Sequence, residues 1–249
     1  MVNKRNLGNT ENFYNQIHKN VVNSVISGND PPTLQELKLL LKKNKNKKSK
    51  ILEIGCGYGQ TLFHLKKFGF KNIYAIDSNI DAYKFIKKNM TSIKIYHDYA
   101  QNLPFKSNFF DIIICHGVLH HTNSLNKGIK EISRVSKKNA KVYLGLYLFK
   151  NSLFEIIIKL ARKIFMIVPM PVMRKLLFFL PDIYTNSILD HLYVPILNCY
   201  KDKQIKKLLK KDFIMSFNKV SNFDFFSKSK LFNFVVGDGL FKLYVVIKK

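Results

Sequence analysis

The sequence lacks the features that mark several classes of protein. It has no tryptophan and only three cysteines, Cys56, Cys115 and Cys199, with no CxxC pair, which argues against a disulfide framework and a structural zinc site. Its apolar runs, such as Ile164 to Met173, fall short of the roughly 18 apolar residues of a membrane-spanning helix. The first thirty residues contain no apolar signal core, so we expect a cytoplasmic protein.

Acidic residues and arginine are scarce as well. The chain holds 42 lysines and arginines against 16 acidic residues, a formal net charge of +26, yet only four of the basic residues are arginine. Such an excess is typical of proteins that bind nucleic acid or anionic membranes. Proteins that read phosphates, however, rely on the bidentate arginine fork, which lysine cannot reproduce. We therefore favour solvated lysine faces and disfavour nucleic acid as a partner.

From Lys50 onward, short apolar runs alternate with helical patterns. Strands are predicted over 50–54, 72–76, 93–97, 111–115 and 141–147, with helices over 60–68, 79–89 and 124–137. Near-continuously apolar strands separated by helices indicate a parallel sheet covered on both faces. Two late strands, over 216–226 and 240–247, are expected to pair antiparallel. The predicted fold class is α/β, with an open doubly wound sheet.

A single domain over 1–249 is expected, with no internal repeat. It divides into N-terminal helices over 1–48, including 11–27 and 33–43, a nucleoside-binding core over 49–147, a helical insertion over 148–200, and a C-terminal helix and strands over 201–249. Within the insertion, Leu153 to Val168 is apolar apart from one narrow polar stripe, which predicts a mostly buried helix.

A glycine-rich turn follows the first predicted strand. Glu53-Ile-Gly-Cys-Gly-Tyr-Gly-Gln60 leads into a helix, where the glycines allow a tight turn and the helix N-terminus offers amide donors. Asp77 ends the next strand, where a carboxylate can accept hydrogen bonds from ribose hydroxyls. Strand context and spacing together predict a nucleoside site.

The acid before this turn narrows the choice of nucleoside. Dinucleotide sites use GxGxxG and place a pyrophosphate at the helix end, whereas this chain reads GxGxG after Glu53. A carboxylate there would repel a pyrophosphate and favour a ligand that carries an ammonium and a sulfonium. The residues therefore favour S-adenosyl-L-methionine over NAD.

Five motifs follow in order between Lys50 and Tyr147: ILEIGCGYG, AIDSN, AQNLPF, FFDIIICHGVLHH and EISRV. In order and spacing they resemble the class I S-adenosylmethionine-dependent methyltransferases, in particular their broad small-molecule branch (methyltransferase type 11-like). The resemblance implies a Rossmann-like, mainly parallel seven-stranded sheet with a C-terminal antiparallel hairpin. It also implies a helical lid formed by the insertion 148–200, and S-adenosyl-L-methionine as cofactor.

The same resemblance implies roles for individual residues. The methionine end of the cofactor would be held by Glu53, Gly55, Cys56, Gly57, Tyr58 and Gly59. Asp77 would bind the ribose diol, and His116 would lie beneath the sulfonium. The residues around the adenine would be Ser78, Asp98, Tyr99 and Ala100. Tyr99 stands where the family usually has an acidic residue. Asn139-Ala140 replaces a Gly-Gly turn, and asparagine tolerates the left-handed conformation such a turn needs.

Methyl transfer from a sulfonium is an in-line displacement that disperses charge, so alignment and the local field supply much of the acceleration. No metal is required, and a general base is needed only if the acceptor must lose a proton during attack. His120 and His121 are the first candidates for that base, and His191 in the insertion is another.

The expected acceptor is a small or lipophilic molecule beneath the apolar insertion. Five basic residues of the insertion would touch anionic lipid headgroups in a peripheral membrane contact: Lys159, Arg162, Lys163, Arg174 and Lys175.

Two alternative functions stay open. One is a tRNA or rRNA methyltransferase on the same fold, which the charge favours and the absence of an Asn/Asp-Pro-Pro-Tyr/Phe motif opposes. The other is a non-catalytic cofactor-binding partner subunit. The sequence does not indicate the oligomeric state.

Overall fold

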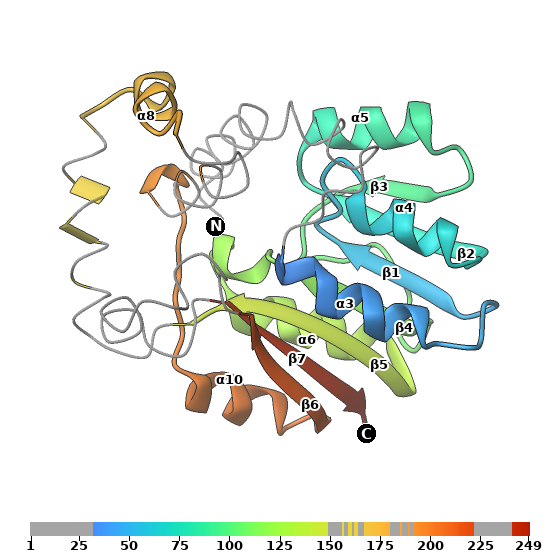
Figure 1. The fold of residues 1–249 in the computed structure, drawn as a ribbon. Coiled ribbons are helices and arrows are strands. Elements are labelled where there is room, and N and C mark those ends of the chain that lie inside the picture. The colour runs from blue at the N-terminus through green and yellow to red at the C-terminus, as the bar shows by residue number, and fades with distance from the viewer. Residues whose placement is uncertain are drawn as a thin grey trace.

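The computed structural model contains one seven-stranded sheet with helices on both faces (Figure 1). It describes residues 32–148, 167–179, 192–221 and 241–249, together with residues 156, 159, 160, 162, 163, 185 and 189. The strands are β1 (Lys50–Ile54), β2 (Asn72–Asp77), β3 (Lys94–His97), β4 (Phe110–His116), β5 (Ser136–Tyr147), β6 (Phe213–Ser221) and β7 (Phe241–Lys248), in the order β3-β2-β1-β4-β5-β7-β6.

The predicted strand pairing is confirmed. β1 to β5 pair parallel with one another, and β7 pairs antiparallel with both β5 and β6. The order reverses at β1, whose two neighbours are β2 and β4, so a crevice for a ligand is expected at its carboxyl end. The predicted strand 216–226 begins earlier, at Phe213, and its residues 222–226 lie outside the described part of the chain.

The helices follow the predicted pattern. They are α3 (Pro32–Lys42), α4 (Gln60–Lys67), α5 (Ile80–Asn89), the 3-10 turn η1 (Leu119–His121), α6 (Leu125–Val135), α8 (Met170–Leu176) and α10 (Asp202–Leu209). The helix predicted over 124–137 ends at Val135, because Ser136 has extended backbone and begins β5. Asn139 adopts the predicted left-handed conformation, with φ of 64°. The helix predicted over 11–27, and most of that predicted over 153–168, lie outside the described residues.

Two apolar layers hold the helices onto the sheet. One buries side chains of α3, α4 and α5 against alternate residues of the strands, such as Ile51 and Ile112. The other buries α6 and α10 against the opposite residues, such as Leu52 and Ile113. In Figure 1 the parallel strands point their carboxyl ends toward the side of the molecule on which α8 lies. The strands are apolar on both faces because both faces are covered.

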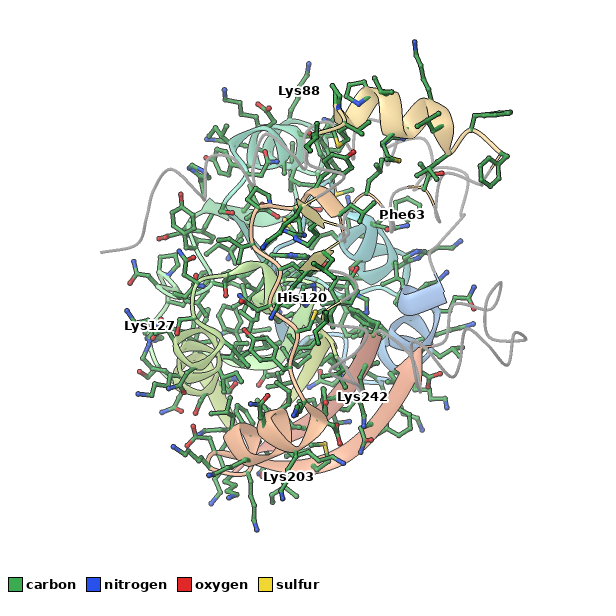
Figure 2. The ribbon with its side chains drawn as sticks, turned by 90° about the vertical axis from the view of Figure 1, so that its left-hand side faces the viewer. Phe63, Lys88, His120, Lys127, Lys203 and Lys242 are labelled. Atoms are coloured by element: carbon green, nitrogen blue, oxygen red, sulfur yellow. The ribbon has the colours of Figure 1, made fainter. Side chains whose placement is uncertain are left out.

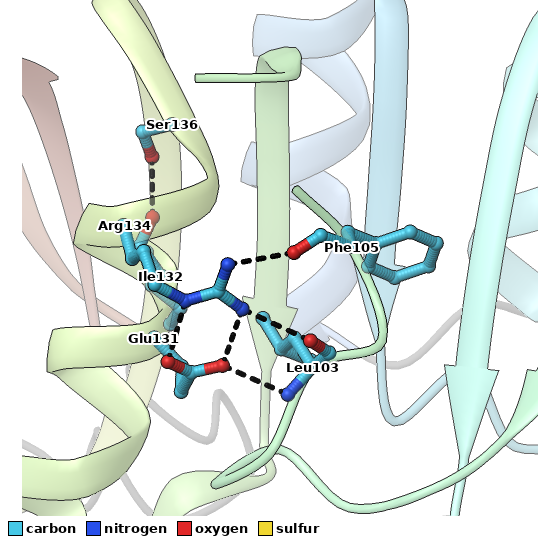
Figure 3. A network of polar contacts seen from close by, with 6 residues as sticks. All are labelled: Leu103, Phe105, Glu131, Ile132, Arg134 and Ser136. Carbon is cyan, nitrogen blue, oxygen red and sulfur yellow. Dashed lines mark hydrogen bonds and ion pairs between the residues drawn. The ribbon is translucent and has the colours of Figure 1, made fainter. Parts of the chain in front are cut away.

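A polar clamp ties the loop that follows β3 to α6 (Figure 3). The Arg134 guanidinium donates to the carbonyl oxygens of Phe105, at 2.6 Å, and Leu103, at 2.9 Å. It also forms a bidentate pair with Glu131, whose Oε2 accepts from the Leu103 N–H at 2.9 Å. Because the planar fork matches both a carboxylate and two carbonyl groups, Arg134 holds two backbone groups of the loop, and its partner Glu131 holds a third.

We predict that Arg134→Gln lowers the free energy of unfolding by about 1–3 kcal/mol, because charge-assisted bonds to the loop are lost. Urea unfolding measures the change. The control Lys137→Gln breaks an exposed ion pair with Asp111 at 2.6 Å and should cost less than about 1 kcal/mol. Equal losses in the two variants would contradict a special role for the clamp.

The contribution of the Glu131–Arg134 pair to stability should change with pH in a defined direction. The hydrogen bond with Arg134 lowers the pKa of the Glu131 carboxyl. The stability it contributes is therefore complete above the ordinary carboxyl pKa and is lost as pH falls through the lower, folded-state pKa. Arg134→Gln should lose this acid sensitivity.

Candidate cofactor-binding site

The glycine turn connects β1 to α4 at the point where the strand order reverses. Gly55, Gly57 and Gly59 all have positive φ, 70°, 50° and 88°. At Gly55, a Cβ would come within 2.3 Å of Val118, so the chain from β4 approaches too closely for any side chain. At Gly57, a Cβ would meet nothing within 4 Å, so the middle of the turn faces open space that a ligand can use.

Asp77 joins this turn to the end of β2. Its Oδ2 accepts the Gly57 N–H at 2.6 Å, and its Oδ1 accepts the Asn79 N–H at 2.8 Å. Burial raises the pKa of the Asp77 carboxyl, and the amides of Asn79 and Gly57 oppose that rise. Asn79 caps α5, because its side chain accepts from the N–H groups of Asp81 and Ala82.

Glu53 lies on β1 directly below the turn and is only 4% exposed. Among the described residues, its Oε2 accepts no hydrogen bond. Burial raises the pKa of Glu53 to about 8, a hydrogen bond with Thr61 lowers it, and the charge of Asp77 raises it further. Two carboxyl groups thus share one buried site at the ends of neighbouring strands, in a chain with only 16 acidic residues.

The chemistry of these groups fits a cationic nucleoside. An ammonium or sulfonium beside Glu53 would favour the ionised form of its carboxyl group, which burial disfavours in the free protein, whereas a pyrophosphate would add negative charge. Gly117, at the end of β4, likewise has positive φ, 80°, and open space where its Cβ would stand. Within the described residues, no group of three or more histidine, cysteine or acidic side chains is arranged to hold a metal ion.

The loop after β3 lies beside this site. The Asp98 N–H donates to the Asp77 carbonyl at 3.2 Å, and the His97 ring bonds the Ser78 carbonyl at 2.8 Å, so backbone contacts join the two segments. Asp98 Oδ1 accepts the Tyr99 N–H at 2.8 Å, while the Tyr99 side chain is 37% exposed and Ala100 is buried. The sequence alone did not lead us to predict that Arg134 and Glu131 hold this loop in place. The feature that could have indicated it is an acidic residue and an arginine three residues apart on one predicted helix.

His116 and His120 are placed differently. His116 ends β4, is half-buried, and its ring lies 4.7 Å from that of Phe241. His120 is completely buried in η1 (Figure 2), and its Nδ1 accepts the Tyr147 N–H at 3.3 Å. A neutral ring with Nδ1 as acceptor carries its proton on Nε2.

His121 is 7% exposed, and its Nδ1 lies 2.9 Å from the Ile196 carbonyl oxygen, so this nitrogen is the donor. The next turn of chain is held as well, because Asn198 donates its N–H to the His120 carbonyl and its side-chain amide to that of Thr122. Both histidines of η1 therefore have structural contacts, to β5 and to residues 196–198. Their role as general base stays a prediction, and His191 lies outside the described residues.

The geometry defines a nucleoside-binding protein of the Rossmann-like, doubly wound class. Residues 52–144 match the family model described as a methyltransferase domain. Residues 52–144 therefore carry a methyltransferase domain of the class I, S-adenosylmethionine-dependent type, and S-adenosyl-L-methionine is the cofactor that this match implies.

Individual relatives cover only part of the chain. An uncharacterized protein of Methanocaldococcus jannaschii is 35% identical over 139 residues, 55% of this chain and 57% of that protein. The tRNA U34 carboxymethyltransferase of Campylobacter hominis is 29% identical over 99 residues, 38% of this chain and 35% of that protein. The chain thus spans about half or less of the length of these relatives. The crystal structure of YcgJ from Bacillus subtilis shares the fold, with a TM-score of 0.56 at 14% identity over 85% of this chain and 94% of that one.

The raised pKa of Glu53 predicts a pH dependence of stability. Between the ordinary carboxyl pKa and about 8, the folded protein keeps a proton on Glu53 that the unfolded chain has lost, so stability falls as pH rises through this range. Glu53→Gln should remove that slope and raise the melting temperature most above about pH 8. Melting curves across this range test it, with Glu36→Gln on α3 as control; parallel curves for wild type and Glu53→Gln would refute the assignment.

Proposed function

We propose that this chain is a methyltransferase that uses S-adenosyl-L-methionine to methylate a small or lipophilic acceptor. The observation that carries the proposal is the pair of buried carboxyl groups, Glu53 and Asp77, beside the open backbone of Gly57. No other cluster in the described part of the chain combines buried acids with a glycine turn that has room for a ligand. The family match over residues 52–144 supports the same proposal.

Different residues of the site would bind different parts of the cofactor. Glu53 and the turn from Gly55 to Gly59 would hold the methionine end, because the acid favours an ammonium and the turn leaves open space where a Cβ of Gly57 would stand. Asp77 already accepts hydrogen bonds from two backbone N–H groups, and its oxygens have lone pairs left with which it would bind the ribose diol. Ser78, Asp98, Tyr99 and Ala100 would line the adenine, with Tyr99 exposed enough to move onto its face.

When bound, the cofactor supplies a sulfonium methyl group, which passes to a lone pair of the acceptor while the carbon–sulfur bond breaks and its electrons stay on sulfur. The chain itself contributes the alignment of the reactants and an electrostatic field. The two carboxyl groups stabilise the cationic donor, and the contacts of η1 hold in place the backbone beside His116. An acceptor that must lose a proton needs a nearby base. His120, His121 and His191 remain the proposed candidates, with His120 and His121 reaching the acceptor only if their present contacts are exchanged.

The domain organisation belongs to the same proposal. The core over 49–147 would bind the cofactor, the insertion over 148–200 would form the acceptor pocket and its lid, and the segments 1–48 and 201–249 would complete a single domain. The described part of the insertion is rich in apolar side chains around Met173, which supports a lipophilic acceptor.

RNA is the second candidate acceptor. The net charge of +26 and the relation to a tRNA U34 carboxymethyltransferase favour it. The scarcity of arginine opposes it, since lysine lacks the bidentate fork that phosphate recognition uses. A non-catalytic cofactor-binding subunit is the third candidate, and only the first two predict turnover.

Cofactor binding by the wild type should release a proton at neutral pH. Glu53 carries a proton there in the free protein, and a bound cation favours the ionised form. Calorimetry with S-adenosylmethionine in phosphate and in Tris buffer should therefore give different apparent enthalpies, and Glu53→Gln should shrink that difference while Glu36→Gln should not. Asp77→Asn should weaken binding roughly tenfold or more through the lost acceptors. Failure of the wild type to bind would overturn the proposed function.

The acceptor class can be separated with a methyl-labelled cofactor. Incubation with a lipid extract and, separately, with total tRNA should place label in the organic phase and leave the tRNA unlabelled, and Asp77→Asn, which binds the cofactor more weakly, should transfer less label. Label in tRNA, together with RNA binding that falls steeply with salt, would replace the lipophilic acceptor by RNA.

A further inference from the structure

The short helix α8 carries both buried and exposed apolar side chains. Its inner face contributes Met173, which is 6% exposed and packs with Leu189 and Val194 in a small separate core. The contact is fixed by polar bonds around it, since the Tyr193 hydroxyl donates to the Val168 carbonyl at 2.9 Å. The helix is thus held in place by its inner face, and its outer face is not needed for that packing.

The outer face and the turns at either end of α8 expose large apolar side chains. The exposed fractions are 83% for Ile167, 46% for Val172, 59% for Leu176, 85% for Phe178 and 67% for Phe179. Single exposed apolar residues are ordinary, but five within thirteen consecutive positions form a patch of the kind that marks an interaction site. Two adjacent phenylalanines at its tip are typical of segments that enter a lipid interface.

Basic side chains accompany this patch. Lys175 is exposed on α8, and Lys159 and Lys163 are exposed on the segment before it. Arg162, which we expected among the lipid contacts, is partly buried and donates to the Val194 carbonyl at 2.5 Å, so it supports the small core instead. No helix among the described residues is long and apolar enough to span a membrane.

We propose that residues 167–179, with Lys159 and Lys163, form a docking surface for an anionic lipid bilayer, into which Phe178 and Phe179 insert. Charge decides between this partner and a second copy of the chain. Two molecules of net charge +26 repel each other, whereas anionic headgroups attract lysines and acyl chains take up the phenylalanines. Figure 1 places α8 on the side to which the parallel strands point, so docking would bring that side to the membrane.

The absence of tryptophan makes a direct test available. Phe179→Trp introduces a single tryptophan at the proposed insertion point, and Ile214→Trp introduces one at a site of similar exposure, 57%, on β6. Vesicles of phosphatidylcholine and phosphatidylglycerol in equal parts should shift the emission of Phe179→Trp to the blue and protect it from acrylamide. They should leave Ile214→Trp unchanged.

A second pair of variants measures how much the two phenylalanines contribute to vesicle binding. The double change Phe178→Ser with Phe179→Ser should weaken the binding to these vesicles, measured by sedimentation, by about tenfold or more, because two large apolar side chains no longer leave water. Ile214→Ser should have no effect. Both variants should keep the melting temperature and cofactor affinity of the wild type, which separates this proposal from the proposed function.

Three outcomes would overturn the docking surface. One is an emission of Phe179→Trp that does not respond to the vesicles. Another is vesicle binding that survives the double serine change and depends on salt alone, since lysines anywhere on the chain would then explain it. The third is a blue shift that appears without vesicles as protein concentration rises, which would make the patch an interface between copies of the chain.

Discussion

The site depends on one unfavourable arrangement, the burial of two carboxyl groups side by side at the ends of β1 and β2. Glu53 and Asp77 are both shielded from water, and the burial of each disfavours its charged form. Asp77 is partly compensated by backbone amides, one of them from the glycine turn itself. Glu53 is compensated far less, so a cationic ligand would relieve a cost that the fold already carries. The turn, the parallel strands and the helix packing all serve to keep these two groups in place.

Around this pair, most other polar contacts fix backbone segments instead of performing chemistry. Arg134 and Glu131 hold the loop after β3, and the histidines of η1 join β5 to residues 196–198. Such contacts matter because a cofactor site made of loops is only as accurate as the elements that support it. The proposed membrane surface lies on a different part of the chain and relies on different physics, the exposure of apolar groups beside lysines.

Prediction from sequence worked best where the pattern is local. Alternating apolar and helical segments gave the sheet strands within a few residues, and the glycine turn and Asp77, predicted to belong to one site, do lie together. Prediction was weakest for side chains whose surroundings come from distant segments. His120 looked like a candidate base because it follows β4, yet the structure buries it against Tyr147, whose N–H it accepts across 27 residues of sequence. Nothing adjacent to it in the chain announces that contact.

The sequence by itself determined the α/β class, the strand polarity implied by continuous apolar runs, the left-handed turn at Asn139 and the acid that precedes the glycine turn. These follow from period, residue type and backbone preference, which act over a few positions. Only the tertiary structure decided that Glu53 is buried with Asp77, that Arg134 holds a distant loop, and that α8 keeps an apolar face in water. Burial and charge compensation depend on which segments meet in space, and no short stretch of sequence records that.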